Sequence, residues 1–161
     1  MWTATAAQRW AHTRRIDDVV REYAARGDRV SIVVADRTFE GTVVAVGDDR
    51  IDVGTSSGTV SVHTAFADAR GAIRAPITIR RSRRARSGGR RLPAMLVTFR
   101  ARLRELEDAS GSVRLGVFHT GTEYVGAIVV GDDHVVVSGD DEVIVPAAWV
   151  AYVATEPGVG A

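Results

Sequence analysis

The chain of 161 residues contains two similar stretches, offset from one another by about 83 residues. The matched pairs are GDDRIDV (47–53) with GDDHVVV (131–137), VSVHTAF (60–66) with VIVPAAW (143–149), and IDDVVREYAARGDRV (16–30) with FRARLRELEDASGSV (99–113). An internal repeat constrains the fold strongly, because each copy must form the same supersecondary unit. We therefore expect two similar units in tandem.

Each unit of roughly 80 residues is close to the lower size limit of a stable domain, so we expect the two to pack together. Apolar residues make up 45% and charged residues 25%, as in ordinary globular proteins. The absence of cysteine excludes disulfides, thiol catalysis and thiolate metal sites. The start of the chain has no apolar signal region, and no run approaches the roughly 18 apolar residues of a membrane span. We expect a cytoplasmic protein without membrane contact.

Arginine accounts for all 21 basic residues, and neither lysine nor asparagine occurs. Both missing residues have A-rich codons, which is typical of a very GC-rich bacterial genome. The distribution of the arginines is more informative than their number. Residues 69–104 contain twelve arginines and no acidic residue, although the whole chain carries a net charge of +1. The sequence thus places a basic middle segment between two acidic units.

The first unit is predicted to start with a helix at about residues 6–26, because Trp10, Ile16, Val20 and Tyr23 recur at helical spacing. Short strands are predicted at 30–35, 38–46, 50–54, 59–63 and within 71–79. Pro76 lacks a backbone N–H donor, so the last of these strands should lie at a sheet edge or carry a break.

The second unit is predicted to follow the same order, with a helix from near Pro93 to Asp108. Its strands are predicted at 113–119, 123–130, 134–138, 142–145 and 150–154. The expected domain boundaries are 1–79 for the first helix and barrel, 80–91 for an Arg-rich linker, 92–155 for the second helix and barrel, and 156–161 for a tail. Trp149 matches Phe66 of the first unit, and we expect it in a core.

The predicted fold class is mainly β with α, built from two small antiparallel β-barrels that each follow a helix. Five strands with a strongly bent second strand can close into such a barrel, which removes most exposed sheet edges. Gly41 and Gly126 lie where the bend would need a residue without Cβ.

This pattern resembles the Sm-like proteins, whose units have a helix followed by five strands. TFEGTVVAVGDDRIDV and EYVGAIVVGDDHVVV resemble the first Sm signature, and VIVPAAWVAYV resembles the second. The chain is also similar to tandem proteins of high-GC actinobacteria. The Sm resemblance implies association of units through their fourth and fifth strands, within the chain or in a homo-oligomer.

The resemblance does not extend to the nucleotide pocket of Sm proteins. The position of the pocket asparagine falls on Asp52 and Val136, and the position of the Arg-Gly pair falls on His63-Thr64 and Pro146-Ala147. An aspartate would repel phosphate, and valine offers no hydrogen bond. We therefore expect the Sm fold without the family's RNA pocket.

The clustered arginines are the main candidate site: Arg80, Arg81, Arg83, Arg84, Arg86, Arg90 and Arg91. Arginines on a flexible segment can neutralise phosphates and bind nucleic acid without sequence specificity. The same arginines could instead contact the acidic units of their own chain or a protein partner. The sequence leaves both interpretations open.

The acidic positions Asp48, Asp49, Asp132 and Asp133, with 140–142, could hold a divalent cation. Gly-Asp-Asp is also ordinary turn chemistry, which its place in both units favours. The four histidines have no ligand spacing, and the serines have no triad partners. We expect no metal site, no cofactor and no catalytic residues.

The sequence predicts a non-catalytic binding or scaffold protein that associates with RNA or another polyanion through residues 80–91. The alternative is a protein-interaction or regulatory domain that does not bind nucleic acid, and an enzyme of unknown type ranks third.

Overall fold

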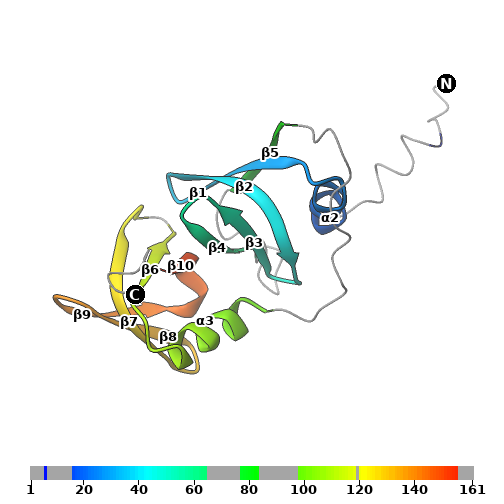
Figure 1. The fold of residues 1–161 in the computed structure, drawn as a ribbon. Coiled ribbons are helices and arrows are strands. Elements are labelled where there is room, and N and C mark those ends of the chain that lie inside the picture. Colours follow the sequence, from blue (N-terminus) through cyan, green and yellow to red (C-terminus); the bar gives the residue numbers. More distant parts are fainter. Residues whose placement is uncertain (1–5, 7–15, 65–76, 84–97, 119, 156–161) are drawn as a thin grey trace, which may run out of the picture.

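The computed structural model describes residue 6 and residues 16–64, 77–83, 98–118 and 120–155 (Figure 1). The first half consists of helix α2 (Ile16–Arg26) and strands β1 (Arg29–Val34), β2 (Arg37–Val46), β3 (Arg50–Thr55), β4 (Gly58–His63) and β5 (Ile77–Arg83). The second half consists of helix α3 (Phe99–Asp108), strands β6 (Val113–Val117), β7 (Glu123–Val130), β8 (His134–Ser138) and β9 (Glu142–Pro146), the short 3-10 helix η1 (Ala147–Trp149) and strand β10 (Val150–Thr155).

The ten strands within the described residues form one antiparallel sheet in the order β5-β1-β2-β3-β4-β10-β6-β7-β8-β9. The prediction of two closed barrels is wrong, because the sheet is open. Closure of the first half would require β4 to pair with β5, but β4 pairs with β10, with Val62 opposite Tyr152. Strands β5 and β9 therefore remain as the two edges, and Figure 1 shows them at opposite ends of the molecule.

Strand β10 belongs to both hydrophobic cores. Ala151, Tyr152 and Ala154 pack with the buried residues of the first half, whereas Val150 and Val153 pack with those of the second half. From Tyr152 to Ala154 the side chains alternate between the two cores, and a register shift between Val150 and Tyr152 lets Ala151 face the same core as Tyr152. The two halves are thus joined by shared apolar burial as well as by the backbone hydrogen bonds of β10.

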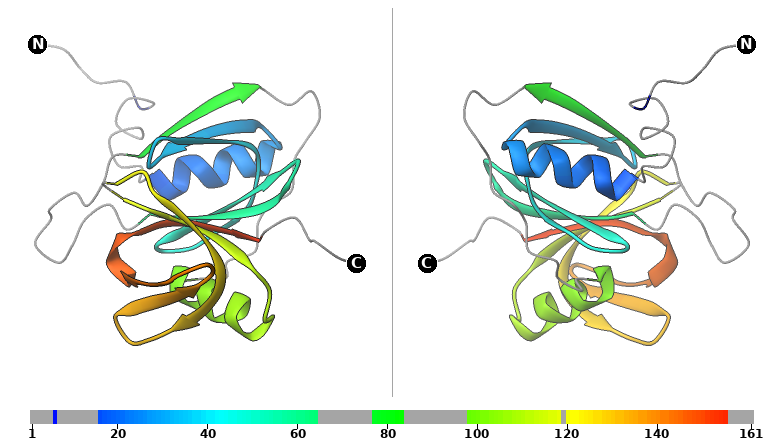
Figure 2. Two further views of the ribbon diagram at one scale, coloured as in Figure 1. Left: turned by 90° about the vertical axis from the view of Figure 1, so that its left-hand side faces the viewer. Right: turned by 90° about the vertical axis from the view of Figure 1, so that its right-hand side faces the viewer.

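The helices cover different parts of the sheet. Helix α2 inserts Val20 and Ala24 into the first core, and helix α3 inserts Phe99, Leu103 and Leu106 into the second. The two views of Figure 2 show α2 against the first half and α3 beneath the second half. Among the described residues, no helix has the length and apolar character needed to cross a membrane.

The first helix ends at Arg26 as predicted, whereas the second helix starts later than predicted. Helix α3 begins at Phe99, later than the predicted start at Pro93, because Thr98 has an extended backbone and its hydroxyl accepts a hydrogen bond from Ala101 N–H. This is the geometry of an N-cap, the residue at which a helix starts. The first helix is described from Ile16 onward, and most of its predicted first part, residues 7–15, lies outside the described residues.

Gly41 and Gly126 permit a close approach of neighbouring strands. A Cβ at Gly41 would lie 2.0 Å from the carbonyl oxygen of Gly54, and one at Gly126 would lie 2.3 Å from that of Ser138. Neither distance can accommodate a side chain without movement of the backbone. The prediction that both positions need a residue without Cβ is confirmed, although the sheet that they shape is open.

The prediction that Trp149 lies in a core is wrong, because half of its surface is exposed. Trp149 ends η1, in which no residue is buried, and Val150 takes the buried position that follows. Because η1 lies at the surface, the indole of Trp149 lies there too, and burial begins only with β10 at Val150. The matching residue, Phe66, lies outside the described residues.

Candidate functional site

The first part of the predicted linker is a β-strand. Strand β5 spans Ile77–Arg83, later than the strand predicted within 71–79, and pairs with β1. Ile77 lies opposite Val34 and Ile79 opposite Ile32, and both isoleucines pack against the first core. The pairing and this apolar contact hold Arg80, Arg81 and Arg83 in a strand, which corrects their assignment to a mobile segment. The other candidate arginines, Arg84, Arg86, Arg90 and Arg91, lie outside the described residues.

Arg81 interacts with its own chain. Its Nη1 atom lies 3.7 Å from Oδ2 of Asp28, and its guanidinium lies over the ring of Tyr23, 5.8 Å from the centroid. Asp28 is fully buried, so an ion pair with it offsets part of the cost of burying a carboxylate. For this one arginine, the structure favours the intramolecular interpretation over a phosphate contact.

Arg80 lies on the other face of β5 and is exposed. In the β1–β5 pairing, Arg80 lies opposite Ser31 and Arg83 lies opposite Arg29, which is also exposed. Arg29 could not be assigned to this cluster from the sequence, because it is distant in the chain and only the strand register brings it next to β5. Strand β5 thus forms one sheet edge at which arginines of two strands meet.

The positions equivalent to the Sm pocket in the first half are occupied by contacts within the chain. Nε and Nη2 of Arg50 donate hydrogen bonds to the two carboxylate oxygens of Asp52, at 2.7 and 2.5 Å. Both side chains are buried. The carboxylate of Asp52 is therefore bound to a guanidinium in two places and is not available to a ligand.

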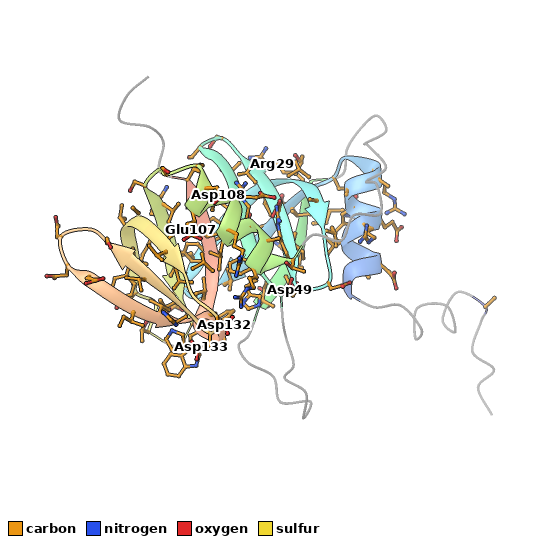
Figure 3. All side chains as sticks on the ribbon, turned by 90° about the horizontal axis from the view of Figure 1, so that it is seen from below. Arg29, Asp49, Glu107, Asp108, Asp132 and Asp133 are labelled. Carbon is orange, nitrogen blue, oxygen red and sulfur yellow. The ribbon has the colours of Figure 1, made fainter. Side chains whose placement is uncertain are left out.

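The start of helix α3 docks beside this pair. Arg50 also donates to the carbonyl of Thr98, at 3.3 Å, and Oδ1 of Asp49 accepts a hydrogen bond from Phe99 N–H at 2.8 Å. Figure 3 shows Asp49 toward one end of α3, and Glu107 and Asp108 at the other end. A carboxylate at a helix N-terminus satisfies a free N–H group and interacts favourably with the helix dipole. Asp49, for which the sequence favoured a turn over a cation ligand, therefore links the two halves.

His63 completes this junction. Its ring is buried and stacks on Phe99, and its Nδ1 atom lies 2.9 Å from the carbonyl oxygen of Val150 in β10. Nearby, Thr64 N–H donates to the carbonyl of Asp49 at 2.8 Å. His63 thus holds the second half against the first, and both His63 and Thr64 are buried.

The equivalent positions of the second half carry an apolar surface. Val136 lies between Val129 on β7 and Ile144 on β9 in the strand register, and 57% of Val129 and 70% of Ile144 are exposed. In the first half, the corresponding residues Asp52 and Ser61 are buried. The positions equivalent to the Sm pocket on this face therefore belong to an apolar row that is exposed at Val129 and Ile144.

The two Gly-Asp-Asp segments are turns with the same closure. Gly47 N–H donates to the carbonyl of Arg50 at 2.7 Å, and Gly131 N–H donates to that of His134 at 2.8 Å. A hydrogen bond from His134 lowers the pKa of Asp133 below its usual range. The interpretation as turns is confirmed, and the part of the chain that the structure describes contains no group of three metal-ligating side chains.

Comparison of the chain with protein-family models, with curated proteins and with solved structures gives no match.

Proposed function

We propose that this protein is a non-catalytic binding protein of two Sm-like units that holds RNA, without sequence specificity, through the arginines at and beyond strand β5. The observation that carries the proposal is the sheet edge where exposed Arg80 and Arg29 lie on paired strands, with Arg83 directly opposite Arg29. Guanidinium groups fixed on a strand can follow a phosphate backbone, and each contact releases counterions from the nucleic acid.

The strand order supports the assignment of two Sm-like units. The order β5-β1-β2-β3-β4 in the first half has its counterpart in β10-β6-β7-β8-β9 in the second. Pairing of β4 with β10 joins the fourth strand of one unit to the fifth strand of the other, which is the association that the resemblance implies.

The occupied positions around Asp52 and His63 favour the β5 edge over the family pocket as the RNA site. The Asp52 carboxylate and the His63 ring are both buried in contacts with Arg50 and with the second half. RNA would have to separate the two halves to reach them. Exposed arginines at the edge require no such rearrangement.

A salt titration of binding tests this proposal. Anisotropy of a fluorescent single-stranded oligoribonucleotide should show binding at about 50 mM salt that weakens steeply as salt rises. Arg80→Gln should reduce the log–log slope by about 0.7, the contribution of one phosphate contact on a single strand. Arg104→Gln is the matched control, because Arg104 is also an exposed arginine and lies on α3.

Replacement of Arg80, Arg83, Arg84, Arg86, Arg90 and Arg91 together by glutamine should abolish binding and leave the melting temperature nearly unchanged. Arg81 is kept in this variant because it pairs with buried Asp28. Unchanged affinity in the six-residue variant, or an equal loss in Arg104→Gln, would contradict the proposal.

The exposed apolar row of the second half favours a second candidate function, association with another protein through β9. The occupant that we propose is a second copy of this chain, whose β5 edge would pair with β9 as β10 pairs with β4 within one chain. Such pairing would also cover Val129, Val136 and Ile144.

Light scattering after size exclusion tests this association over a range of concentrations. Ile144→Lys should shift an assembled wild-type protein toward monomer. Val44→Lys is the matched control, because Val44 is an exposed valine on the first half, away from β9. A monomeric wild-type protein at high concentration, or an equal effect of both lysines, would rule out this mode of assembly.

A further inference from the structure

A cleft lies between the two halves, on the side of the sheet away from the junction of Asp49 and His63. It has a volume of about 350 Å³ and is lined by residues of β1, β2, β3, the β3–β4 turn and β4 from the first half, and of β6, β7 and β10 from the second. This volume falls in the range of small-molecule sites, which run from about 300 to 1,000 Å³. Arg29, which lines one part of the cleft, is labelled in Figure 3 on the side remote from Asp49.

The floor of the cleft is aromatic. The rings of Phe39 on β2 and Tyr152 on β10 meet edge to face, with centroids 4.7 Å apart. Tyr152 is held in place because its ring packs over Gly116, where a Cβ would lie 2.1 Å from the tyrosine ring. Tyr152 is only 2% exposed, so the half-buried ring of Phe39 provides the accessible aromatic surface. A planar apolar group of a ligand could pack on Phe39 and gain both area burial and aromatic contact.

The walls of the cleft carry a net positive charge, because three arginines and two glutamates line it. Glu123 lies between two of the arginines: its carboxylate oxygens are 3.8 Å from Nη2 of Arg37 and 3.8 Å from Nη1 of Arg114. The hydroxyl of Tyr152 donates a hydrogen bond to the same carboxylate.

The guanidinium of Arg37 has N–H donors that make no hydrogen bond to Glu123. Its separation of 3.8 Å from Glu123 exceeds the length of a hydrogen bond, and nearly half of its side chain is exposed to the cleft and solvent. Arg37 comes from the first half, whereas Glu123 and Tyr152 come from the second, so the arrangement exists only when the halves are paired. Burial and the neighbouring carboxylate raise the pKa of Tyr152, which keeps its hydroxyl a donor that fixes Glu123.

We propose that this cleft binds a small anion that carries an aromatic group, with its carboxylate or phosphate on Arg37 and its ring on Phe39, which Tyr152 supports from beneath. Guanidinium groups bind both kinds of anion through paired hydrogen bonds, and the aromatic floor selects against anions without a ring. The ligand would touch both halves and would therefore stabilise their pairing. Arg29 lines both this cleft and the β5 edge, but Arg37 and Phe39, which would hold the ligand, are not part of that edge, and the site does not depend on the RNA-binding proposal.

Isothermal titration calorimetry with four simple probes tests the site. Phenylacetate and phenyl phosphate carry both the ring and the anion, inorganic phosphate lacks the ring, and benzyl alcohol lacks the charge. We expect saturable binding of one or both ring-bearing anions and much weaker binding of the other two probes. The tighter of phenylacetate and phenyl phosphate identifies the anion that the cleft prefers.

Arg37→Gln should weaken this binding roughly tenfold or more, because a hydrogen bond to a charged group is lost. Arg104→Gln is the matched control for net charge and Arg80→Gln is the control for the RNA site, and neither should change the affinity. Amide chemical shifts around Tyr152 should move with ligand in the wild-type protein, which locates the binding independently of affinity.

Absence of binding by the wild-type protein at millimolar probe would overturn the proposal. So would equal affinities of wild-type protein and Arg37→Gln, or binding of inorganic phosphate as tight as that of phenyl phosphate. Because Arg37 is a surface residue, its variant is expected to fold, and an unchanged thermal unfolding curve without ligand checks this.

Discussion

The ring of Phe99 stacks on the ring of His63, with the centroids 4.6 Å apart and an angle of 10° between the ring planes. Phe99 is the first residue of α3 and belongs to the second core, whereas His63 ends β4 of the first half. The stack therefore joins the two halves at the point where Asp49 caps α3. Both rings are buried, so the contact contributes to the stability of the whole molecule.

Phe99→Ala should destabilise the protein by about 3–5 kcal/mol, because it removes a buried ring and leaves a cavity. A double-mutant cycle with His63→Ala, measured by urea unfolding, should give a coupling energy of about 0.5–1.5 kcal/mol for the stack. The matched pair Leu106→Ala and His63→Ala should be additive. Additivity of the Phe99 and His63 changes would show that the stack has no energetic role.

Asp52→Asn should destabilise the protein by about 3–5 kcal/mol, because it leaves the buried Arg50 without its counter-charge. The double variant Arg50→Met/Asp52→Leu should recover most of this loss, since it buries no charge. Chemical denaturation of the three proteins measures the difference. A double variant no more stable than Asp52→Asn would mean that Arg50 acts mainly through its hydrogen bond to Thr98.

The stability of the protein should fall as the pH rises above the ordinary tyrosine value of 10.0. Burial, followed by the hydrogen bond to Glu123, raises the pKa of Tyr152 in the folded state. Above the unfolded value, the unfolded chain releases the phenolic proton while the folded protein retains it, so unfolding becomes more favourable.

Tyr152→Phe should make this alkaline loss smaller. Urea midpoints at about pH 9 and pH 11, on either side of the unfolded value, measure the effect for both proteins. Tyr23→Phe serves as the comparison, because Tyr23 lies in α2 and not between the halves. Parallel pH dependence in wild type and Tyr152→Phe would disprove the assignment to Tyr152.

Ala35→Asn should stabilise the protein by about 1 kcal/mol. Ala35 and Asp36 form the two-residue turn between β1 and β2, and both have positive φ, at 48° and 60°. Such turns favour asparagine and glycine, which adopt this region at lower cost than alanine. Ala35→Val should have the opposite effect because its side chain is β-branched. A higher melting temperature for Ala35→Val than for Ala35→Asn would contradict this interpretation of the turn.

Much of the secondary structure could be predicted from the sequence. The bounds of β7 and β8 agree with prediction, and those of β1 to β4 differ by only a residue or so at either end. Alternation of apolar residues and the turns at Gly47 and Gly131 are local properties of the chain, and they fix local conformation wherever the strands go. The need for glycine at Gly41 and Gly126 was likewise visible in the sequence.

The candidate site was less predictable. The seven arginines were visible as a cluster, but the pairing of Arg81 with Asp28 and the approach of Arg29 to β5 depend on strand register. The cap that Asp49 provides to α3 joins residues of the two halves. None of these contacts leaves a periodic pattern in the sequence, because each arises from chain segments far apart.

The sequence by itself determined that the chain is mainly β, where most strands lie and where the positive charge is concentrated. Only the tertiary structure decided that the sheet stays open. Strand β4 could pair with β5 or with β10, and the residues of β4 alone do not determine which pairing forms. The choice of β10 places Tyr152 beside Phe39 and Glu123 beside Arg37, and so creates the cleft between the halves. Pairing between distant strands is settled by the total burial and hydrogen bonding of the folded molecule, which no local stretch of sequence encodes.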